Sequence, residues 1–544
     1  MPISSLHADI DIPVVDLWTL YLEHPKPYPD DHALLIDGDT GRSYTRAQIK
    51  THSIRFGQGL KHLFRWAKGD VLAFFTPNCV DTPVVNLGLH WAGGVASPAN
   101  PTYTVDELAR QLRDAQAKGL ITQTPFLDAA LQAADKAGLP RDRVLLMGDG
   151  RHDGFRHWTD VTAKGAWLKP KKTPVDAMKD LAYLVYSSGT TGLPKGVMLT
   201  HYNVVANSAQ ADRFDSRGLS WDMDAHLGVL PFFHIYGLSV VINVSLITGA
   251  RCIVMPKWDL EKACKLIQDH RLTFLYVPPP IVLALSKHPA VESFDLSTLR
   301  WVNSGAAPCS RELVLAVWDR LKVGVKQGYG LSETSPTTHT QLSDEWLRFQ
   351  GSVGKMYPNM QAKIVDPDGN EVAHGEAGEL LVKGPNVFQG YWNRPDLQED
   401  TFDKDGWFKT GDVCKIDDKG NFYITDRIKE LIKYKGFQVP PAELEAKLHG
   451  HDKIADCCVI GVWDKELHTE VPRAYVQTKA GVEPSDELAQ EIIQWLSTQV
   501  APPKRLRGGV RFIDIIPKSA SGKILRRVVK EQDKKDNEAP RSKL

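Results

Sequence analysis

The 544-residue sequence lacks net charge, paired cysteines and a long uninterrupted apolar run. Lysine plus arginine and aspartate plus glutamate both number 66, so no overall field favours an anionic membrane, and we expect no nucleic-acid partner. The seven cysteines are an odd number and include no CxxC pair. This pattern indicates neither a zinc site nor a disulfide framework, and it favours a reduced, intracellular protein.

The sequence also lacks the marks of a secretory signal and of a membrane span. The first residues, MPISSLHADIDIP, carry acids and no long apolar core. Residues 227–250 are long enough to span a membrane, but Pro231, His234, Asn243 and internal glycines interrupt them. We therefore expect no transmembrane segment, and we interpret residues 227–250 as a buried element beside a binding pocket.

The length is too great for a single core, so two or more domains are expected. Short apolar runs alternate with helical patterns from about residue 70 to 330, which predicts an α/β fold with parallel sheets covered on both faces. Glycine turns and short alternating strands then predict a small antiparallel unit, a distorted barrel, followed by an α+β segment. The predicted divisions are an N-terminal domain over residues 1–428, a C-terminal domain over 429–530 and a flexible, charged tail over 531–544.

A loop rich in hydroxyls and glycines, YSSGTTGLPKGVMLTH, occupies residues 186–201 after an apolar, strand-like run. Such a loop presents a concave nest of hydrogen-bond donors, which suits a polyphosphate, and Lys195 can add a compact positive charge. The spacing excludes a P-loop, because Pro194 stands where the second glycine is required and Gly196 follows the lysine. A flexible surface connection is the alternative interpretation.

Two further groups of small residues point to a nucleotide. In residues 327–334, QGYGLSET, glycines allow close backbone approach and Tyr329 offers a flat face for a nucleobase. Ser332 can bind phosphate, and the Glu333 carboxylate is a hard oxygen ligand suited to Mg²⁺; an ordinary turn with an exposed glutamate is the alternative. Residues 303–308, NSGAAP, follow a strand-like stretch, and their small side chains let a ligand lie against the backbone.

Two polar groups complete the set. They are WFKTGD at residues 407–412, with DRIKELIKYKGFQVPPAELE at 426–445, and PKSASGKILRR at 517–527. Taken singly, each would be a surface turn or a salt bridge, and Lys523 would be a solvated lysine. Arg526 and Arg527 are expected to be solvated in either case.

The five groups resemble, in residues and in order, the motifs of the adenylate-forming superfamily, which includes acyl-CoA synthetases, beetle luciferases and peptide-synthetase adenylation domains. The resemblance spans residues 186–527 and is closest to 4-coumarate–CoA ligase-like enzymes. It implies a large N-terminal domain of two αβ-layered sheets plus a distorted β-barrel, with a small mobile C-terminal lid. It also implies two steps: a carboxylate and ATP give acyl-AMP and pyrophosphate, and the CoA sulfur then displaces AMP.

The resemblance assigns mechanistic roles to a few residues. Lys523 would bridge the two anions that meet when the carboxylate attacks the α-phosphate, which lowers the barrier electrostatically. The lid would turn about a hinge at Lys429, presenting Lys523 in the first step and the segment from Lys433 to Gly436 in the second. Ser332 stands where the family commonly has threonine, and the hydroxyl is retained.

The resemblance also implies a set of binding residues, with His234 as a second catalytic residue and Glu333 as the Mg²⁺ ligand. Those expected to bind ATP or AMP are Ser187, Ser188, Gly189, Thr190, Thr191, Lys195, Ala306, Gln327, Gly328, Tyr329, Ser332, Asp412, Arg427, Lys429 and Lys433. Those expected to meet CoA are Lys257, Lys435 and Gly436, and those expected at the acyl group are Tyr236, Val240, Asn303, Gly305 and Gly330.

Two other functions remain open at this stage. The first is a luciferase-like oxygenase on the same scaffold, although His234 follows Phe233 as it does in the ligases. The second is a non-catalytic relative that only binds nucleotides. That possibility is disfavoured because four functional residues are retained together: Lys195, Asp412, Arg427 and Lys523.

The acid is expected to be apolar. Plant hydroxycinnamate ligases typically carry lysine where this chain has Asn303, and serine where it has Val240. A pocket that offers a poor partner would not favour a ring hydroxyl. We therefore expect an apolar aryl acid such as phenylacetate or cinnamate, or a medium-chain fatty acid, in preference to 4-coumarate.

The sequence ends with the tripeptide Ser542-Lys543-Leu544. At a C-terminus this tripeptide is an address read by the peroxisomal import receptor. The charged segment before it would leave the tripeptide accessible to a receptor groove. We therefore expect a peroxisomal location.

Overall fold

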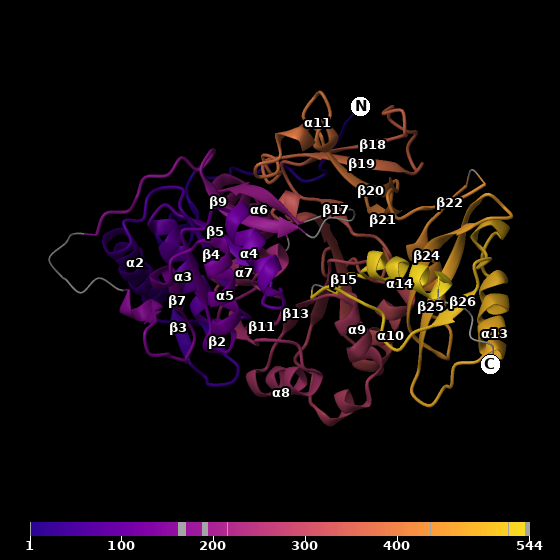
Figure 1. The fold of residues 1–544 in the computed structure, drawn as a ribbon, viewed down its shortest axis with the longest axis horizontal. Helices are drawn as coiled ribbons and strands as arrows, with labels where there is room; N and C mark the ends of the chain where they lie inside the picture. The colour runs from indigo at the N-terminus through magenta and orange to yellow at the C-terminus, as the bar shows by residue number, and fades with distance from the viewer. Residues whose placement is uncertain are drawn as a thin grey trace.

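Four groups of strands build the protein, and each carries its own helices (Figure 1). Two large α/β sheets form the lower left and centre of the view, an antiparallel sheet lies above them, and the C-terminal domain lies to the right. The computed structural model describes residues 2–161, 170–187, 194–214, 216–435, 437–520 and 522–538.

The first sheet has seven strands in the order β10-β9-β5-β4-β6-β7-β8, parallel except where β10 pairs with β9. Its central strands are fully buried apolar runs, as expected when helices cover both faces. The strands are β4 (Val71–Phe75), β5 (Val95–Ala99), β6 (Gly119–Thr122), β7 (Val144–Leu146), β8 (Arg156–His157), β9 (Leu181–Ser187) and β10 (Lys195–Thr200). The helices along this part of the chain are α1 (Leu17–Leu22), α2 (Arg46–Leu63), α3 (Asp81–Trp91), α4 (Val105–Asp114), α5 (Leu127–Ala137) and α6 (His201–Phe214).

The second sheet has nine strands in the order β17-β16-β15-β14-β13-β11-β12-β2-β3. Its central strands from β12 to β15 run parallel, so their carboxyl ends meet at one edge. The strands are β2 (Ala33–Asp37), β3 (Ser43–Thr45), β11 (Ala225–Gly228), β12 (Arg251–Val254), β13 (Phe274–Val277), β14 (Trp301–Ser304), β15 (Gly324–Gly330), β16 (Thr337–Thr340) and β17 (Lys355–Met356). The associated helices are α7 (Ile242–Thr248), α8 (Leu260–His270), α9 (Pro279–Lys287) and α10 (Arg311–Leu321).

The small antiparallel unit expected after residue 350 is a five-stranded sheet that also recruits the N-terminus. Ile3 pairs with Ala362, so a strand formed by the first residues adds to a sheet built from residues more than 350 positions later. The strands, in the order β1-β18-β19-β20-β21, are β1 (Ile3–Ser4), β18 (Gln361–Val365), β19 (Gly378–Lys383), β20 (Phe408–Ile416) and β21 (Phe422–Arg427), with α11 (Gln398–Thr401) beside them.

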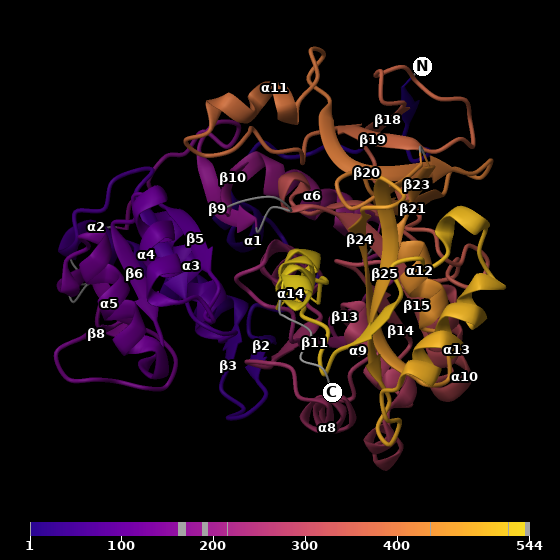
Figure 2. The ribbon, with the colours of Figure 1, turned by 45° about the vertical axis from the view of Figure 1, so that its right-hand side comes forward.

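The C-terminal domain has a core of its own. Its buried side chains form clusters separate from those of the two large sheets, so this domain can move as a unit. Figure 2 shows its sheet and helices in front of the nine-stranded sheet. Its elements are β22 (Ile432–Tyr434), β23 (Phe437–Val439), α12 (Pro441–Leu448), β24 (Ile454–Asp464), β25 (Thr469–Thr478), α13 (Asp486–Ser497), β26 (Val510–Phe512) and α14 (Arg526–Glu538).

Helix α14 corrects one expectation. The charged segment from residue 531 was expected to be a flexible tail, yet the helix continues to Glu538. Val529 is fully buried against the C-terminal sheet, and the carboxylate of Asp533 pairs with Arg473 and accepts the Tyr475 hydroxyl. These contacts, which composition does not reveal, hold the charged segment as a helix.

Residues 227–250 form a strand end, a π-helical turn and a helix rather than a membrane span. Pro231 follows β11, and a π-helical stretch occupies Tyr236–Val241. Helix α7 ends at Thr248 and is capped by Gly249, whose φ of +82° is the left-handed conformation that glycine adopts most readily. None of the helices in the described part of the chain has the length and apolar content of a membrane span.

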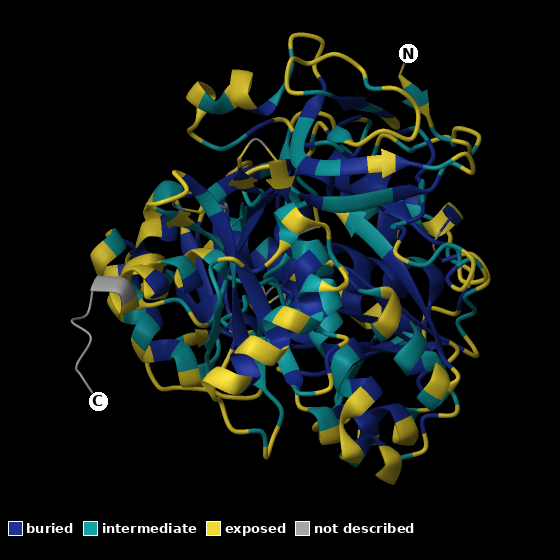
Figure 3. Cartoon of the chain, turned by 90° about the vertical axis from the view of Figure 1, so that its right-hand side faces the viewer, coloured by how far each residue is buried: buried dark blue, intermediate teal, exposed yellow. Residues whose placement is uncertain are grey.

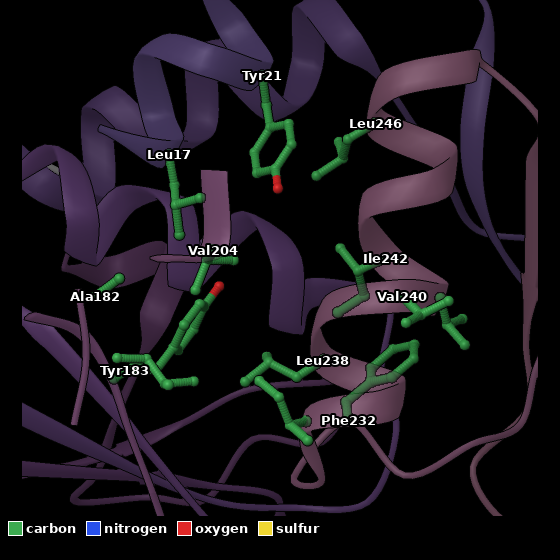
Figure 4. Close-up of a cluster of buried hydrophobic side chains, with 14 of the residues drawn as sticks. Leu17, Tyr21, Ala182, Tyr183, Val204, Phe232, Leu238, Val240, Ile242 and Leu246 are labelled. Carbon is green, nitrogen blue, oxygen red and sulfur yellow. The ribbon is translucent and has the colours of Figure 1, made fainter. Parts of the chain in front are cut away.

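The apolar core lies directly behind this π-helical turn. In Figure 4, side chains from α1, β9 and α6 face those of the turn and of α7. From the side of the C-terminal domain, exposed residues gather on outer loops and helices, whereas the strands behind them are buried (Figure 3). The turn is therefore packed against a buried apolar cluster. The labelled members of the cluster are Leu17, Tyr21, Ala182, Tyr183, Val204, Phe232, Leu238, Val240, Ile242 and Leu246.

Candidate active site

A cavity of about 770 Å³ lies where the two large sheets, the antiparallel sheet and the C-terminal domain meet. It opens at the carboxyl ends of the parallel strands, which is where open α/β sheets bind ligands. Most of the expected site residues line it. They are Ser187, Lys195, His234, Tyr236, Val240, Asn303, Gly305, Ala306, Gly328, Tyr329, Gly330, Ser332, Glu333, Arg427, Lys429 and Lys523.

Arg427 and Tyr329 line one wall, and both contact Asp412, which is 2% exposed and is not itself among the lining residues. Asp412 lies directly opposite Arg427 in the β20–β21 ladder, and Arg427 Nε is 2.9 Å from Asp412 Oδ1. The Tyr329 hydroxyl donates to Asp412 Oδ2 at 2.6 Å. The Asp412 carboxylate is buried, and because one oxygen pairs with Arg427 while the other accepts the Tyr329 hydroxyl, it is held in one orientation.

Lys195 and Glu333 both line the end of the cavity where phosphates are expected. Lys195 is the first residue of β10, and burial together with the charges of Lys429 and Arg394 lowers its pKa. Ser187 is the last residue of β9. The loop between them, with Ser188, Gly189, Thr190 and Thr191, lies outside the described residues.

The Glu333 carboxylate suits a magnesium ion whose other ligands come mainly from phosphates and water. Only 8% of Glu333 is exposed, and its Oε1 accepts the Tyr391 hydroxyl at 2.8 Å. No cluster of three or more metal-ligating side chains occurs among the described residues. A single hard oxygen ligand suits Mg²⁺, which is commonly bound by one or two carboxylates together with substrate phosphates and water.

The small residues around the cavity serve the packing of the protein as well as ligand access. A Cβ atom on Gly305 would lie 2.9 Å from the Tyr236 ring, and one on Gly330 would lie 2.0 Å from the Pro336 carbonyl oxygen. Ala306 has a φ of +70°, a strained value for a residue with a side chain. These positions bring the chain close to the ligand space, as expected, and larger side chains would not fit.

The acyl end of the cavity is formed by the π-helical turn and by β14. Tyr236 and Val240 project from the turn, and Asn303 lies on the strand. Asn303 is 5% exposed, and its Oδ1 has no hydrogen-bond donor among the described residues. Apolar side chains, including Phe233 and Ile235, make up much of the remaining wall.

His234 and Lys523 approach the cavity from opposite domains. Burial, with a further contribution from Lys523, lowers the pKa of His234 to about 4, so the imidazole is neutral at pH 7. Its Nδ1 accepts the Tyr236 backbone N–H at 3.3 Å, which leaves Nε2 to carry the proton and donate it in a hydrogen bond. Burial, then the charge of Arg427, lowers the pKa of Lys523 to about 8.

The residues expected at CoA do not line the cavity. Lys257 is exposed after β12, and Lys433 and Lys435 are exposed on the C-terminal domain. The backbone N–H groups of Lys433 and Lys435 donate to side chains of β25. Gly436 lies outside the described residues. The structure thus brings Lys523 into the cavity and leaves the described part of the Lys433–Gly436 segment on the outer face. Of the residues expected to bind ATP or AMP, Gln327, Asp412 and Lys433 are also absent from the lining.

Arg526 was expected to be solvated, and this expectation is wrong. Its guanidinium is 12% exposed, lies 2.8 Å from Glu430 and also pairs with Glu445. Arg527, as expected, is exposed. Arg526 thus ties the Lys523 turn to Glu430, the residue that follows the expected hinge at Lys429.

Sequence reasoning also missed the buried Lys326 and the half-buried Tyr391. Lys326 is 2% exposed, and its ammonium lies 4.3 Å from the centre of the Trp301 ring. Lys326 is the register partner of Asn303, so the two side chains share one face of the sheet. No pattern marked Tyr391.

Comparison with known proteins decides the family. A model described as AMP-binding enzyme matches residues 22–392, and one described as AMP-binding enzyme C-terminal domain matches residues 443–523. The chain belongs to the AMP-binding enzyme family. It is 36% identical to probable 4-coumarate–CoA ligase 1 of Dictyostelium discoideum, over 97% of both chains. It is 38% identical to 4-coumarate–CoA ligase of Pinus taeda, over 91% of both.

A solved structure of the same family agrees. The ATP-bound MatB of Rhodopseudomonas palustris is 30% identical and superposes with a TM-score of 0.83, covering 95% of this chain and 99% of MatB. The fold expected from the sequence, a large N-terminal domain with a small C-terminal domain, is therefore confirmed.

Proposed function

We propose that this AMP-forming acid–CoA ligase acts on an apolar aryl acid or a medium-chain fatty acid. One observation carries the proposal: Lys523, Lys195, Arg427 and Tyr329 line a single cavity that is also lined by the apolar side chains of Phe233, Ile235 and Val240. An acid, a nucleotide and the ammonium that neutralises their encounter would thus meet in one place.

The first step uses cations on both sides of the phosphates. Asp412 binds the ribose, Lys195 binds the β- and γ-phosphates, and the loop after Ser187 supplies further donors. The acid lies along the π-helical turn with its carboxylate near His234 Nε2. Lys523 then bridges the attacking carboxylate and the α-phosphate, stabilising the charge that builds up as pyrophosphate leaves. Bound together with ATP and Glu333, Mg²⁺ would neutralise part of the phosphate charge.

The second step needs a different face of the C-terminal domain. In the structure Lys523 lines the cavity, whereas Lys433 and Lys435 do not. The segment expected to assist the CoA thiol is therefore not beside the site of the adenylate in this orientation of the domain. Rotation about Lys429 would withdraw Lys523 and bring the Lys433–Gly436 segment to the adenylate. Lys257 and Lys435 would then meet the phosphates of CoA, and the CoA sulfur would displace AMP. The separate core of this domain is compatible with such a rotation.

The acid specificity can be tested with a panel of phenylacetate, cinnamate, octanoate and 4-coumarate. We expect kcat/KM for CoA-ester formation to be several-fold higher for cinnamate or phenylacetate than for 4-coumarate. Val240 and Phe233 offer no hydrogen-bond partner to a ring hydroxyl. Asn303 acts against this preference, because its Oδ1 has no donor among the described residues and could accept a hydrogen bond from that hydroxyl. A several-fold preference for 4-coumarate would overturn the proposed class.

A matched variant locates the cause. Asn303→Lys places a flexible donor at the same strand position, so we expect it to raise the relative kcat/KM for 4-coumarate without changing KM for ATP. An Asn303→Lys enzyme with the wild-type order of acids would show that the specificity is set elsewhere. Acid-dependent pyrophosphate release without formation of a CoA ester would instead point to an acceptor other than CoA.

We also propose that the protein is directed to peroxisomes. The final tripeptide, Ser542-Lys543-Leu544, lies outside the described residues, and a peroxisomal ligase would supply CoA thioesters to chain-shortening enzymes. A fluorescent protein fused ahead of residues 530–544 should become punctate with a peroxisomal marker in a eukaryotic cell. Deleting the tripeptide should make the signal diffuse. Diffuse fluorescence with the tripeptide intact would reject the proposal.

A further inference from the structure

A short segment between the antiparallel sheet and α11, residues 388–392, runs alongside both halves of the phosphate site. Its backbone follows β10: the Met198 N–H donates to the Gly390 carbonyl at 3.1 Å, and the Trp392 N–H donates to the Gly196 carbonyl at 2.8 Å. At its other end the Phe388 N–H donates to the Glu333 carbonyl at 2.9 Å. The segment therefore fixes the distance between Glu333 and the start of β10, where Lys195 lies.

Tyr391 is the side chain of this segment that reaches into the cavity. Its hydroxyl donates to Glu333 Oε1 at 2.8 Å, and the centre of its ring lies 4.9 Å from Lys195 Nζ. One aromatic residue thus contacts both the carboxylate expected to bind the metal and the ammonium expected to bind phosphate.

We propose that Tyr391 is a positioning residue that holds Glu333 and Lys195 in the arrangement that binds Mg²⁺-loaded ATP. The inference rests on the proposed function, because it takes Glu333 and Lys195 as the metal and phosphate ligands. The hydroxyl fixes the rotation of the Glu333 carboxylate by engaging one oxygen. The second oxygen, Oε2, has no donor among the described residues and is left for the ion.

The ring acts separately on Lys195. The lysine side chain is long and flexible, and an aromatic face within about 6 Å attracts its ammonium electrostatically. Keeping the ammonium over Tyr391 therefore directs it toward the polyphosphate beside Glu333. The two contacts belong to different parts of one side chain, so they can be removed one at a time.

The test measures nucleotide binding by isothermal titration calorimetry without acid or CoA, so that no turnover occurs. ATP is titrated once with excess Mg²⁺ and once with EDTA. Tyr391→Phe keeps the ring and removes the hydroxyl. We expect it to weaken Mg²⁺-ATP binding about tenfold, the loss typical of a hydrogen bond to a charged group, and to leave metal-free ATP binding unchanged. Tyr391→Leu removes both contacts and should weaken both titrations.

Tyr423→Phe is the matched control. The Tyr423 hydroxyl also donates to a carboxylate, that of Asp417, at 3.1 Å, and neither residue lines the cavity. Tyr423→Phe thus removes a similar hydrogen bond outside the cavity, and both ATP titrations should match those of the wild type. Thermal unfolding of each variant checks that the fold is retained, and Tyr391→Phe alone carries the test if Tyr391→Leu does not fold.

Two results would overturn the inference. One is a Tyr391→Phe protein that binds Mg²⁺-ATP as the wild type does. The other is equal weakening of both titrations by Tyr391→Phe, which would indicate a general loss of packing. Failure of the proposed function looks different, because the wild-type protein itself would then show no binding of Mg²⁺-ATP.

Discussion

Replacing Lys523 with methionine should abolish acyl-adenylate formation while sparing thioester formation from preformed acyl-AMP. Methionine keeps an unbranched side chain of similar length but removes the charge that bridges the carboxylate and the α-phosphate. Loss of one preorganised electrostatic contact commonly costs about 10²- to 10³-fold in rate. The first half-reaction is measured by acid-dependent exchange of pyrophosphate into ATP, and the second by release of AMP when CoA is added to synthetic acyl-AMP.

Arg527→Met is the matched control for this variant. Arg527 is a cation four residues away, but it is exposed and pairs only with Glu531 among the described residues. Removing its charge should change neither half-reaction more than about twofold, in line with the small worth of exposed ion pairs. Equal loss of both half-reactions in Lys523→Met would contradict the division of labour between two lid positions.

The adenylation step should also slow above pH 8. Burial, followed by the charge of Arg427, lowers the pKa of Lys523 to about 8, so the catalytic ammonium is present below this pH and is lost as the pH rises through it. Because kcat/KM reports ionisations of the free enzyme, we expect it to fall about tenfold per pH unit above pH 8 in pyrophosphate exchange. His234, with a pKa of about 4, does not titrate in this range.

Lys523→Arg separates this ionisation from others. The guanidinium remains charged at every accessible pH, so the fall above pH 8 should disappear even if the larger side chain lowers the overall rate. A pH profile of the Lys523→Arg enzyme that still falls with a midpoint near 8 would assign the ionisation to another group.

The motif residues could be predicted from sequence because their chemistry is local. A hydroxyl-rich loop, a tyrosine between glycines and a lysine in a Ser-Gly-Lys turn each carry their character in a few adjacent residues. The structure places Lys195, Tyr329 and Lys523 around one cavity, as expected. What the motifs did not contain was register: Asp412 and Arg427 are fifteen positions apart and become direct neighbours only because β20 pairs with β21.

The residues that sequence reasoning missed depend on contacts between distant segments. Arg526 looks like a solvated neighbour of Arg527, and its burial follows from two carboxylates, that of Glu430 just after β21 and that of Glu445 on α12. Tyr391 is one of fifteen tyrosines, and only the approach of its segment to β10 brings it beside Glu333. Composition likewise predicted a flexible segment where α14 is held by buried ion pairs of Asp533.

The end of β21 would give nucleotide binding a thermodynamic link to the proposed domain rotation. Arg427, which pairs with Asp412, is the last residue of this strand and stands two positions before Lys429, the proposed hinge. The preceding residue, Asp426, accepts the backbone N–H of Ala442 at the start of α12 in the C-terminal domain. If nucleotide affinity differs between two orientations of that domain, reciprocity requires the orientation to shift by the same factor when nucleotide binds. ATP, acyl-AMP and AMP would then each favour a different ratio of the two domain orientations. Release of AMP would return this ratio to that of the unliganded protein.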